Sequence, residues 1–158
     1  MAWWPSDQWQ RMLAGENCPM CADAHLGTNA ASDLIAELPA TYARLVHNQT
    51  HAGYAVVIFK RHVSELHDLS PADLAAFWTD ATAVGAVIEE LFAPVKLNYL
   101  VMGARAPHLH VHVFPHYSDG DPFANVDISE GTVRLDDAHQ LERVAAMRAA
   151  LMERSRPN

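Results

Sequence analysis

The sequence is poor in cysteine, in basic side chains and in long apolar runs, and each shortage excludes a class of protein. Two cysteines among 158 residues are too few for a disulfide scaffold. The 11 Lys and Arg are scattered among 19 Asp and Glu, for a net charge of −8, which argues against duplex or long single-stranded nucleic acid as a partner. No stretch approaches the roughly 18 continuous apolar residues that a membrane span requires. Residues 1–11 hold no apolar run of signal-peptide length, so we expect a cytoplasmic protein that binds neither membranes nor nucleic acid.

The length and the order of the predicted elements indicate a single α+β domain. A chain of this size buries about 70% of the surface that its unfolded form exposes, which is enough to build a core without added crosslinks. Four strands are expected, at 41–47, 54–59, 96–103 and 108–115. The last two of these should pair as a hairpin. One antiparallel sheet with a long helix packed on it is an α+β arrangement. We place the domain at 1–158, its motif-bearing core at about 16–117 and a C-terminal loop and helix at about 118–158.

Two helices are expected, and the longer one has a clear start signal. Ser70 stands at the cap, Pro71 lies in the first turn and Asp73 follows three residues after the cap, so this helix should run to about Phe92. The side chains expected on its inner face are Leu74, Phe77, Trp78, Ala81, Val84, Ile88 and Leu91. A final helix is expected over about 137–154.

Three histidines alternate with aliphatic residues in the run 106–115. Side chains alternate between the two faces of a strand, so His108, His110 and His112 should share one face. The aliphatic residues between them have the composition of a core-facing surface. The alternative is a polar outer face that happens to be rich in histidine, although charged or hydroxylic residues would serve that purpose equally well.

A row of imidazoles is suited to phosphoryl chemistry. Imidazole attacks phosphorus, and the phosphorylated imidazole is a good leaving group, so covalent catalysis divides one difficult displacement into two easier ones. The attacking imidazole must be neutral, with its far nitrogen held by an acceptor, while neighbouring groups donate hydrogen bonds to the phosphoryl oxygens. A strand face with three histidines meets these needs without a catalytic metal.

The two cysteines, Cys18 and Cys21, stand in Cys-x-x-Cys spacing, which lets both reach one tetrahedral metal ion. The same spacing fits a redox pair or two buried thiols. Histidine would have to complete a metal site, because the chain has no further cysteine. The chain has 10 histidines, and spacing alone does not choose among them.

The His-x-His-x-His run followed by two apolar residues resembles the motif of the histidine-triad (HIT) superfamily. The resemblance extends from about Cys18 to Tyr117, roughly two-thirds of the chain. It implies a HIT-like fold, in which an antiparallel sheet of about five strands carries a long helix and is followed by a C-terminal helix.

The resemblance also implies a structural zinc ion. Several HIT proteins, and the related galactose-1-phosphate uridylyltransferases, bind zinc through an N-terminal Cys-x-x-Cys, a histidine that closes the strand before the long helix, and the first histidine of the triad. The matching residues here are Cys18, Cys21, His62 and His108. The alternatives are that His62 caps backbone groups at a strand end and that the cysteines form a small apolar packing unit.

In HIT enzymes the middle histidine of the triad is the nucleophile, which implies that role for His110 within a catalytic group of His108, His110 and His112. It would attack the α-phosphate of a nucleotide derivative and form a nucleotidyl-histidine, which water, phosphate or another acceptor then cleaves. His112 would contact phosphate oxygens. Asn98 matches the family asparagine beside the phosphates, and Asn48 matches a polar residue that binds ribose, although it is equally typical of a turn.

The sequence departs from the best-known branches of the family near the expected site. Gly53 is followed by Tyr54, where many members have a histidine that can protonate the leaving group. The loop before the triad, 103–107, is short; its Arg105 would add positive charge near the phosphates or lie in solvent. His116 stands where an arginine is usual. The patterns Gln-Thr-x-x-Gly-Tyr, Lys-Arg-His-Val and Leu-Asn-Tyr resemble a bacterial branch labelled diadenosine-tetraphosphate-hydrolase-like.

The resemblance implies a nucleotide hydrolase or transferase acting on dinucleoside polyphosphates, nucleoside phosphoramidates or related nucleotidyl compounds. One alternative is a non-enzymatic nucleotide-binding or regulatory protein on the same fold. Another is a metallohydrolase in which the triad itself holds a catalytic metal. HIT proteins are commonly homodimers, so a homodimer is expected, although the apolar groups of the sequence fit a monomer equally well.

Overall fold

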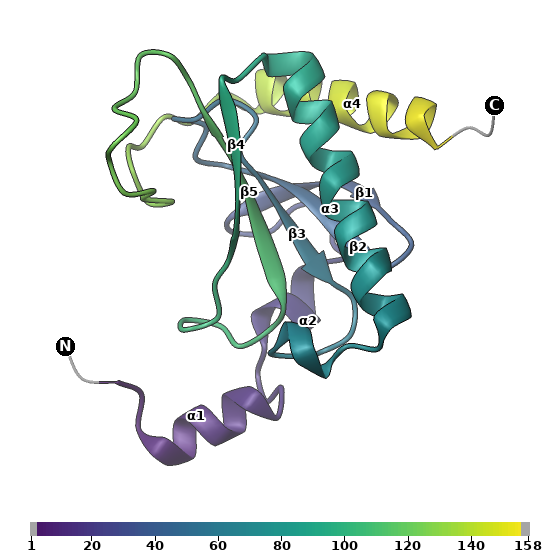
Figure 1. The fold of residues 1–158 in the computed structure, drawn as a ribbon, viewed down its shortest axis with the longest axis vertical. Helices are drawn as coiled ribbons and strands as arrows, with labels where there is room; N and C mark the ends of the chain where they lie inside the picture. Colours follow the sequence, from purple (N-terminus) through teal and green to yellow (C-terminus); the bar gives the residue numbers. More distant parts are fainter. Residues whose placement is uncertain (1–2, 156–158) are drawn as a thin grey trace.

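The computed structural model describes residues 3–155 and contains one five-stranded antiparallel sheet in the order β1-β2-β3-β5-β4 (Figure 1). The strands are β1 (Ser32–Glu37), β2 (Thr41–Val46), β3 (Ala55–Phe59), β4 (Lys96–Val101) and β5 (His110–His116). The helices are α1 (Ser6–Leu13), α2 (Pro19–Asp23), the 3-10 turn η1 (Leu66–Asp68), α3 (Pro71–Phe92) and α4 (Asp137–Arg154). The predicted α+β class, the sheet and both long helices are confirmed. The single domain over 1–158 stays a prediction, and its residues 1–2 and 156–158 lie outside the described chain.

Helix α3 begins and ends where its local chemistry requires. The Ser70 hydroxyl accepts a hydrogen bond from the backbone N–H of Asp73 at 3.1 Å, which satisfies one free donor of the first turn. Ala93 ends the helix in the left-handed conformation at φ 48°. The helix packs on one face of the sheet through its fully buried side chains, among them Phe77, Ala81, Val84 and Ile88.

One side chain expected on the inner face of α3 is not there. Leu91 is 41% exposed, so its assignment to the core was wrong. It lies in the last turn of α3 and borders a hollow between α3 and α4, while its neighbour Phe92 continues the inner face and packs against the core. Among residues 3–155, no helix is both long and apolar enough to cross a lipid bilayer.

The histidine strand β5 lies between β3 and β4, and its register fixes what faces each side chain. His110 pairs with Ile58, and His112 pairs with Val56 on β3 and with Leu100 on β4. The predicted hairpin of β4 and β5 is confirmed. The alternate residues of the run, Leu109, Val111 and Val113, belong to the core that α3 covers. Strand alternation therefore turns the histidines toward the face of the sheet opposite α3.

The segment that carries the cysteines folds as a tight turn into α2. Gly15 and Asn17 adopt positive φ of 83° and 54°, and Pro19 occupies the first position of α2. Glycine and asparagine tolerate the left-handed region, and proline suits the first helical turn. This turn places Cys18 and Cys21 on adjacent points of one short helix.

A buried arginine fastens the end of this segment to the sheet. Arg44 on β2 is completely buried, and its guanidinium donates to the carbonyls of Ala24, Leu26 and Ser32 at 2.7, 2.6 and 2.7 Å. Its Nε donates to the Ser32 hydroxyl at 2.8 Å. Because a buried charge is tolerated only when its donors are satisfied, these bonds hold the chain after α2 in one position.

Candidate active site and metal centre

The triad divides between two adjacent sites. His108 turns its ring toward Cys18 and Cys21, whereas His110 and His112 lie further along the strand on the open face. The rings of His110 and His112 contact edge to face, with centroids 4.9 Å apart. His108 lies two residues before β5, so the predicted strand over 108–115 begins two residues too early, and the histidine run divides between a Cys/His cluster before β5 and a pair of imidazoles on it.

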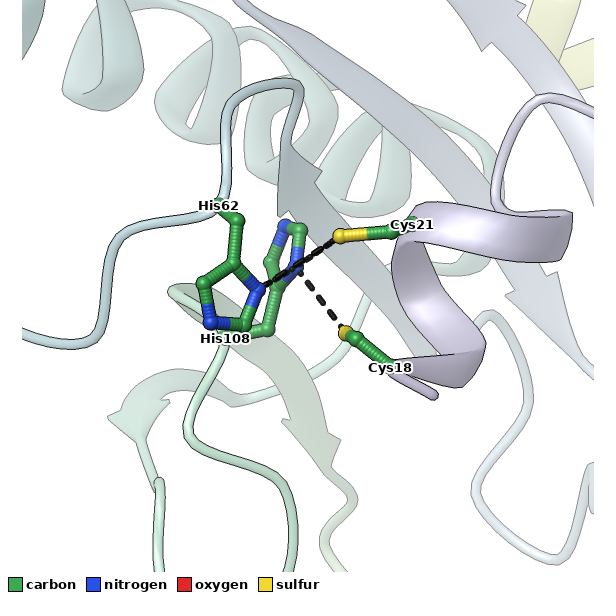
Figure 2. A group of neighbouring side chains, drawn as sticks. All are labelled: Cys18, Cys21, His62 and His108. Carbon is green, nitrogen blue, oxygen red and sulfur yellow. Dashed lines mark hydrogen bonds between the residues drawn. The ribbon is translucent and has the colours of Figure 1, made fainter. Parts of the chain in front are cut away.

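The structure brings together the four residues implied as metal ligands (Figure 2). Nδ1 of His108 lies 3.4 Å from each cysteine sulfur and 3.3 Å from Nδ1 of His62, and the sulfur of Cys21 lies 3.4 Å from Nδ1 of His62. All four ligand atoms lie within 4.8 Å of one another. In a tetrahedral zinc site, sulfur and nitrogen ligands are about 3.6 Å apart and two nitrogens about 3.3 Å apart. The cluster therefore has the donor set and the size that a metal ion needs.

Two backbone carbonyls bind the Nε2 atoms of His62 and His108, which leaves Nδ1 of each ring free to bind a metal. Nε2–H of His108 donates to the carbonyl of Phe59 at 2.7 Å, and Nε2–H of His62 donates to the carbonyl of Leu13 at 3.1 Å. Each neutral ring then carries its lone pair on Nδ1, the atom that faces the cluster. Burial, together with a hydrogen bond to Cys18, raises the pKa of the Cys21 thiol to about 11.

His110 has the arrangement that a nucleophilic imidazole needs. Its Nδ1–H donates to the carbonyl of His108 at 2.6 Å, which leaves the lone pair on Nε2. The side chain is 5% exposed, and burial lowers its pKa, so the ring is neutral at physiological pH. Within the described chain, the buried polar side-chain atoms without a partner lie elsewhere, on His47, His116 and Gln140, so Nε2 of His110 reaches solvent.

His112 is held by a side chain rather than by the backbone. Its Nδ1 lies 2.7 Å from the hydroxyl of Tyr54, the residue that precedes β3. Burial, with a smaller contribution from His110, lowers the pKa of His112 to about 4. Tyr54 stood out in the sequence only as a departure from the family pattern, because its contact with His112 depends on the pairing of β3 with β5.

The three remaining candidate residues lie in different surroundings. Asn98 pairs with Phe114 across the sheet and lines a cavity of about 370 Å³ together with Lys96 and His116. Arg105 is exposed and borders a small cavity of about 90 Å³ beside Cys18, on the side of the Cys/His cluster. Asn98 therefore lies near the open histidine face, whereas Arg105 lies near the cysteines.

Asn48 is occupied by the segment that follows β5. Its side-chain amide donates to the carbonyls of Glu130 and Gly131 at 3.0 and 3.1 Å, and its oxygen accepts from the Thr50 hydroxyl at 2.7 Å. The backbone N–H of Gln49 adds a bond to the carbonyl of Val133 at 2.7 Å. In this conformation Asn48 holds the 118–134 segment against the end of β2.

Comparison with known proteins identifies the family of this chain. The model of the HIT domain matches residues 28–119, more than half of the chain. The chain belongs to the HIT family. Among curated relatives, this HIT protein is 31% identical over 91 residues to a bis(5'-nucleosyl)-tetraphosphatase (asymmetrical) of Schizosaccharomyces pombe, covering 51% of the chain and 50% of the relative. The match thus spans about half the length of that enzyme. Protein hit of Bacillus subtilis is 26% identical over 120 residues, covering 73% of the chain and 81% of the relative.

Solved structures of HIT proteins confirm the predicted HIT-like fold. A histidine triad protein from Bradyrhizobium japonicum superposes with a TM-score of 0.67 at 21% identity, covering 77% of this chain and 91% of that protein. A zinc-bound histidine triad family protein from Mycobacterium smegmatis superposes with a TM-score of 0.62 at 22% identity, covering 86% and 94%. At such identities the likeness establishes the fold alone.

We predict that His112 titrates near pH 4, well below the ordinary histidine pKa of 6.5. Between these values the unfolded chain binds a proton that folded His112 excludes, so this histidine makes the protein less stable as the pH falls from about 6.5 to about 4. NMR titration of the imidazole signals measures the midpoint. Exposed His139, whose pKa is raised by Asp136, is the internal reference and should titrate above 6.5. A midpoint near 6.5 for His112 would contradict the prediction.

Proposed function

We propose that this HIT protein is a nucleotide hydrolase or transferase that cleaves at the α-phosphate through a covalent nucleotidyl-histidine on His110. The observation that carries the proposal is the 2.6 Å hydrogen bond from Nδ1–H of His110 to the carbonyl of His108, which leaves an accessible lone pair on Nε2. Family membership and the similarity to a nucleosyl tetraphosphatase support a nucleotide substrate. The candidate substrates are dinucleoside polyphosphates, nucleoside phosphoramidates and related nucleotidyl compounds.

The reaction proceeds by two displacements at one phosphorus atom. Nε2 of His110 forms a bond to the α-phosphorus, and the bond from phosphorus to the leaving oxygen or nitrogen breaks, with its electron pair going to the leaving group. Water or another acceptor then attacks the same phosphorus and releases a proton, and the phosphorus–Nε2 bond breaks to restore the lone pair of His110. A polyphosphate leaves without needing a proton, which suits a site that has Tyr54 where other members have a histidine.

Other residues bind the substrate around this reaction. His112 and Asn98 contact the phosphoryl oxygens, and Arg105 attracts the outer phosphates of a leaving group long enough to extend toward the side of the cysteines, where Arg105 lies. Asn48 binds the ribose by exchanging its bonds to the carbonyls of Glu130 and Gly131 for bonds to the sugar hydroxyls. The 118–134 segment must therefore yield at this point when a nucleotide enters.

The decisive variant is His110→Ala, which should lower the release of AMP from diadenosine tetraphosphate by at least about a thousandfold, because no other group forms the covalent intermediate. His110→Gly should recover part of the activity when free imidazole is supplied. His67→Ala removes an exposed histidine of η1 and is the matched control. Undiminished turnover by folded His110→Ala would refute the proposal, and binding of AMP without turnover of any substrate by the wild type would favour a non-enzymatic nucleotide-binding role.

We further propose that the Cys18, Cys21, His62 and His108 cluster binds a structural zinc ion. The ion joins α2, the loop after β3 and the start of β5, which are far apart in the sequence. Of the triad, His108 alone belongs to the Cys/His cluster that could hold a metal ion among residues 3–155, which leaves His110 and His112 free for the substrate. This arrangement favours a structural metal over a metallohydrolase.

Cys21→Ser should lower the zinc content from one ion per chain and reduce the free energy of unfolding. When the free zinc concentration is a thousand times the dissociation constant of the site, zinc binding adds about 4 kcal/mol to the free energy of unfolding. Metal analysis and thermal unfolding measure the two effects, with His25→Asn as a control that removes an exposed histidine near α2. Removal of zinc that abolished turnover at once, with the fold intact, would instead indicate a catalytic metal.

We also propose a homodimer formed through the β4 edge and the adjoining helix α3. β4 ends the sheet, and Val95, Tyr99, Val101 and Met102 leave apolar surface exposed along it. An unpaired apolar edge strand invites pairing with another chain. A second copy would extend the sheet across both subunits.

Sedimentation at micromolar concentration should give twice the mass of one chain, and Val101→Glu should shift the protein to the monomer, because it buries a charge in the interface. Phe123→Glu changes an exposed side chain of the 118–134 segment and should leave the dimer intact. A wild-type protein that sediments as a monomer would rule out this interface.

A further inference from the structure

A single hydrogen bond ties Tyr54 to the third histidine of the triad. The hydroxyl of Tyr54 lies 2.7 Å from Nδ1 of His112, and the two rings have centroids 5.9 Å apart. The Tyr54 ring also packs edge-on against Phe114 at 5.1 Å. Only 4% of Tyr54 is exposed, so this contact fixes the hydroxyl instead of leaving it in solvent.

The direction of this bond follows from the surroundings of the hydroxyl. Within the described chain, His112 Nδ1 is the only hydrogen-bond partner of the Tyr54 hydroxyl. Burial raises the pKa of Tyr54, so the phenol keeps its proton. If Nδ1–H were the donor, the buried phenolic proton would have no acceptor, which is unfavourable. The phenol therefore donates, and Nδ1 of His112 accepts.

This hydrogen bond gives His112 the opposite tautomer to that of His110. A neutral imidazole carries one proton, so His112 bears it on Nε2, whereas His110 bears its proton on Nδ1 and has a bare Nε2. The two ring centroids are 4.9 Å apart, close enough for both Nε2 atoms to reach one phosphoryl group. One nitrogen can attack the phosphorus while the other donates to an oxygen on it.

We infer that Tyr54 is a positioning residue, which holds His112 in the Nε2–H form so that this neutral imidazole donates a hydrogen bond to the phosphoryl oxygens of the nucleotide. The inference rests on the proposed function and deepens it. Tyr54 acts through His112 and does not itself transfer a proton to the leaving group. Tyr54 therefore occupies the position where many family members have a histidine, but its role differs, because it orients His112 and does not protonate the leaving group.

The first test is a double-mutant cycle on AMP release from diadenosine tetraphosphate. Tyr54→Phe removes only the hydroxyl and should lower kcat about tenfold with little change in KM. Without the hydroxyl, His112 no longer holds its proton on Nε2 in every molecule, and this Nε2–H is the donor that stabilises charge developing on the phosphoryl oxygens during the reaction. In a His112→Ala background the same change should have no further effect, since its partner is gone. Tyr42→Phe, which deletes a hydroxyl on the same face of the sheet, is the matched control. An equal loss in both backgrounds would overturn the inference.

The second test reads the proton directly and needs no turnover. Nitrogen-15 NMR of wild-type histidines should show His112 with a bare Nδ1 and a protonated Nε2, and Tyr54→Phe should convert this signal to a mixture of both forms. Thermal unfolding of Tyr54→Phe checks that the fold is retained. A protonated Nδ1 in the wild type would overturn the inference even if the enzyme is active. If no substrate is turned over, the proposed function fails, and the NMR result still decides how Tyr54 sets His112.

Discussion

A fixed partner on one ring nitrogen decides what the other nitrogen of each histidine can do. The carbonyls of Leu13, Phe59 and His108 accept hydrogen bonds from the ring N–H groups of His62, His108 and His110. Because a neutral imidazole has one proton, each of these rings presents a lone pair on its opposite side. Two of the lone pairs face the cysteines, and the third faces the open surface of the sheet. Burial lowers the pKa of His108 and His110, which keeps the lone pairs of these two rings free of protons.

His108 joins the two halves of the site. Its Nδ1 belongs to the cluster of Cys18 and Cys21, and its carbonyl accepts the hydrogen bond from Nδ1–H of His110. A metal ion at the cluster would therefore stabilise the start of β5 at the residue whose carbonyl orients the proposed nucleophile. Under the proposed function, metal binding supports the reaction through the position of the strand, without touching the substrate.

Side chains from distant segments complete the arrangement around β5. Tyr54 reaches His112 from the start of β3, and Asn48 holds the 118–134 segment against the end of β2. Asn48 thus holds the 118–134 segment in place when no nucleotide is bound, and in the proposed reaction it binds the ribose. The two tasks are compatible because backbone carbonyls and sugar hydroxyls can accept the same amide protons.

The sequence by itself determined the features that depend on near neighbours: the alternation that puts His108, His110 and His112 on one face, the Ser70 cap, and the close pairing of Cys18 with Cys21. Resemblance to a family added His62 to the cysteines, which spacing alone did not do. Only the tertiary structure decided which nitrogen of each ring is free, that Tyr54 bonds to His112, that Asn48 is occupied, and that Leu91 is exposed. These outcomes depend on strand register and on packing between segments tens of residues apart, and local sequence patterns do not encode such distances.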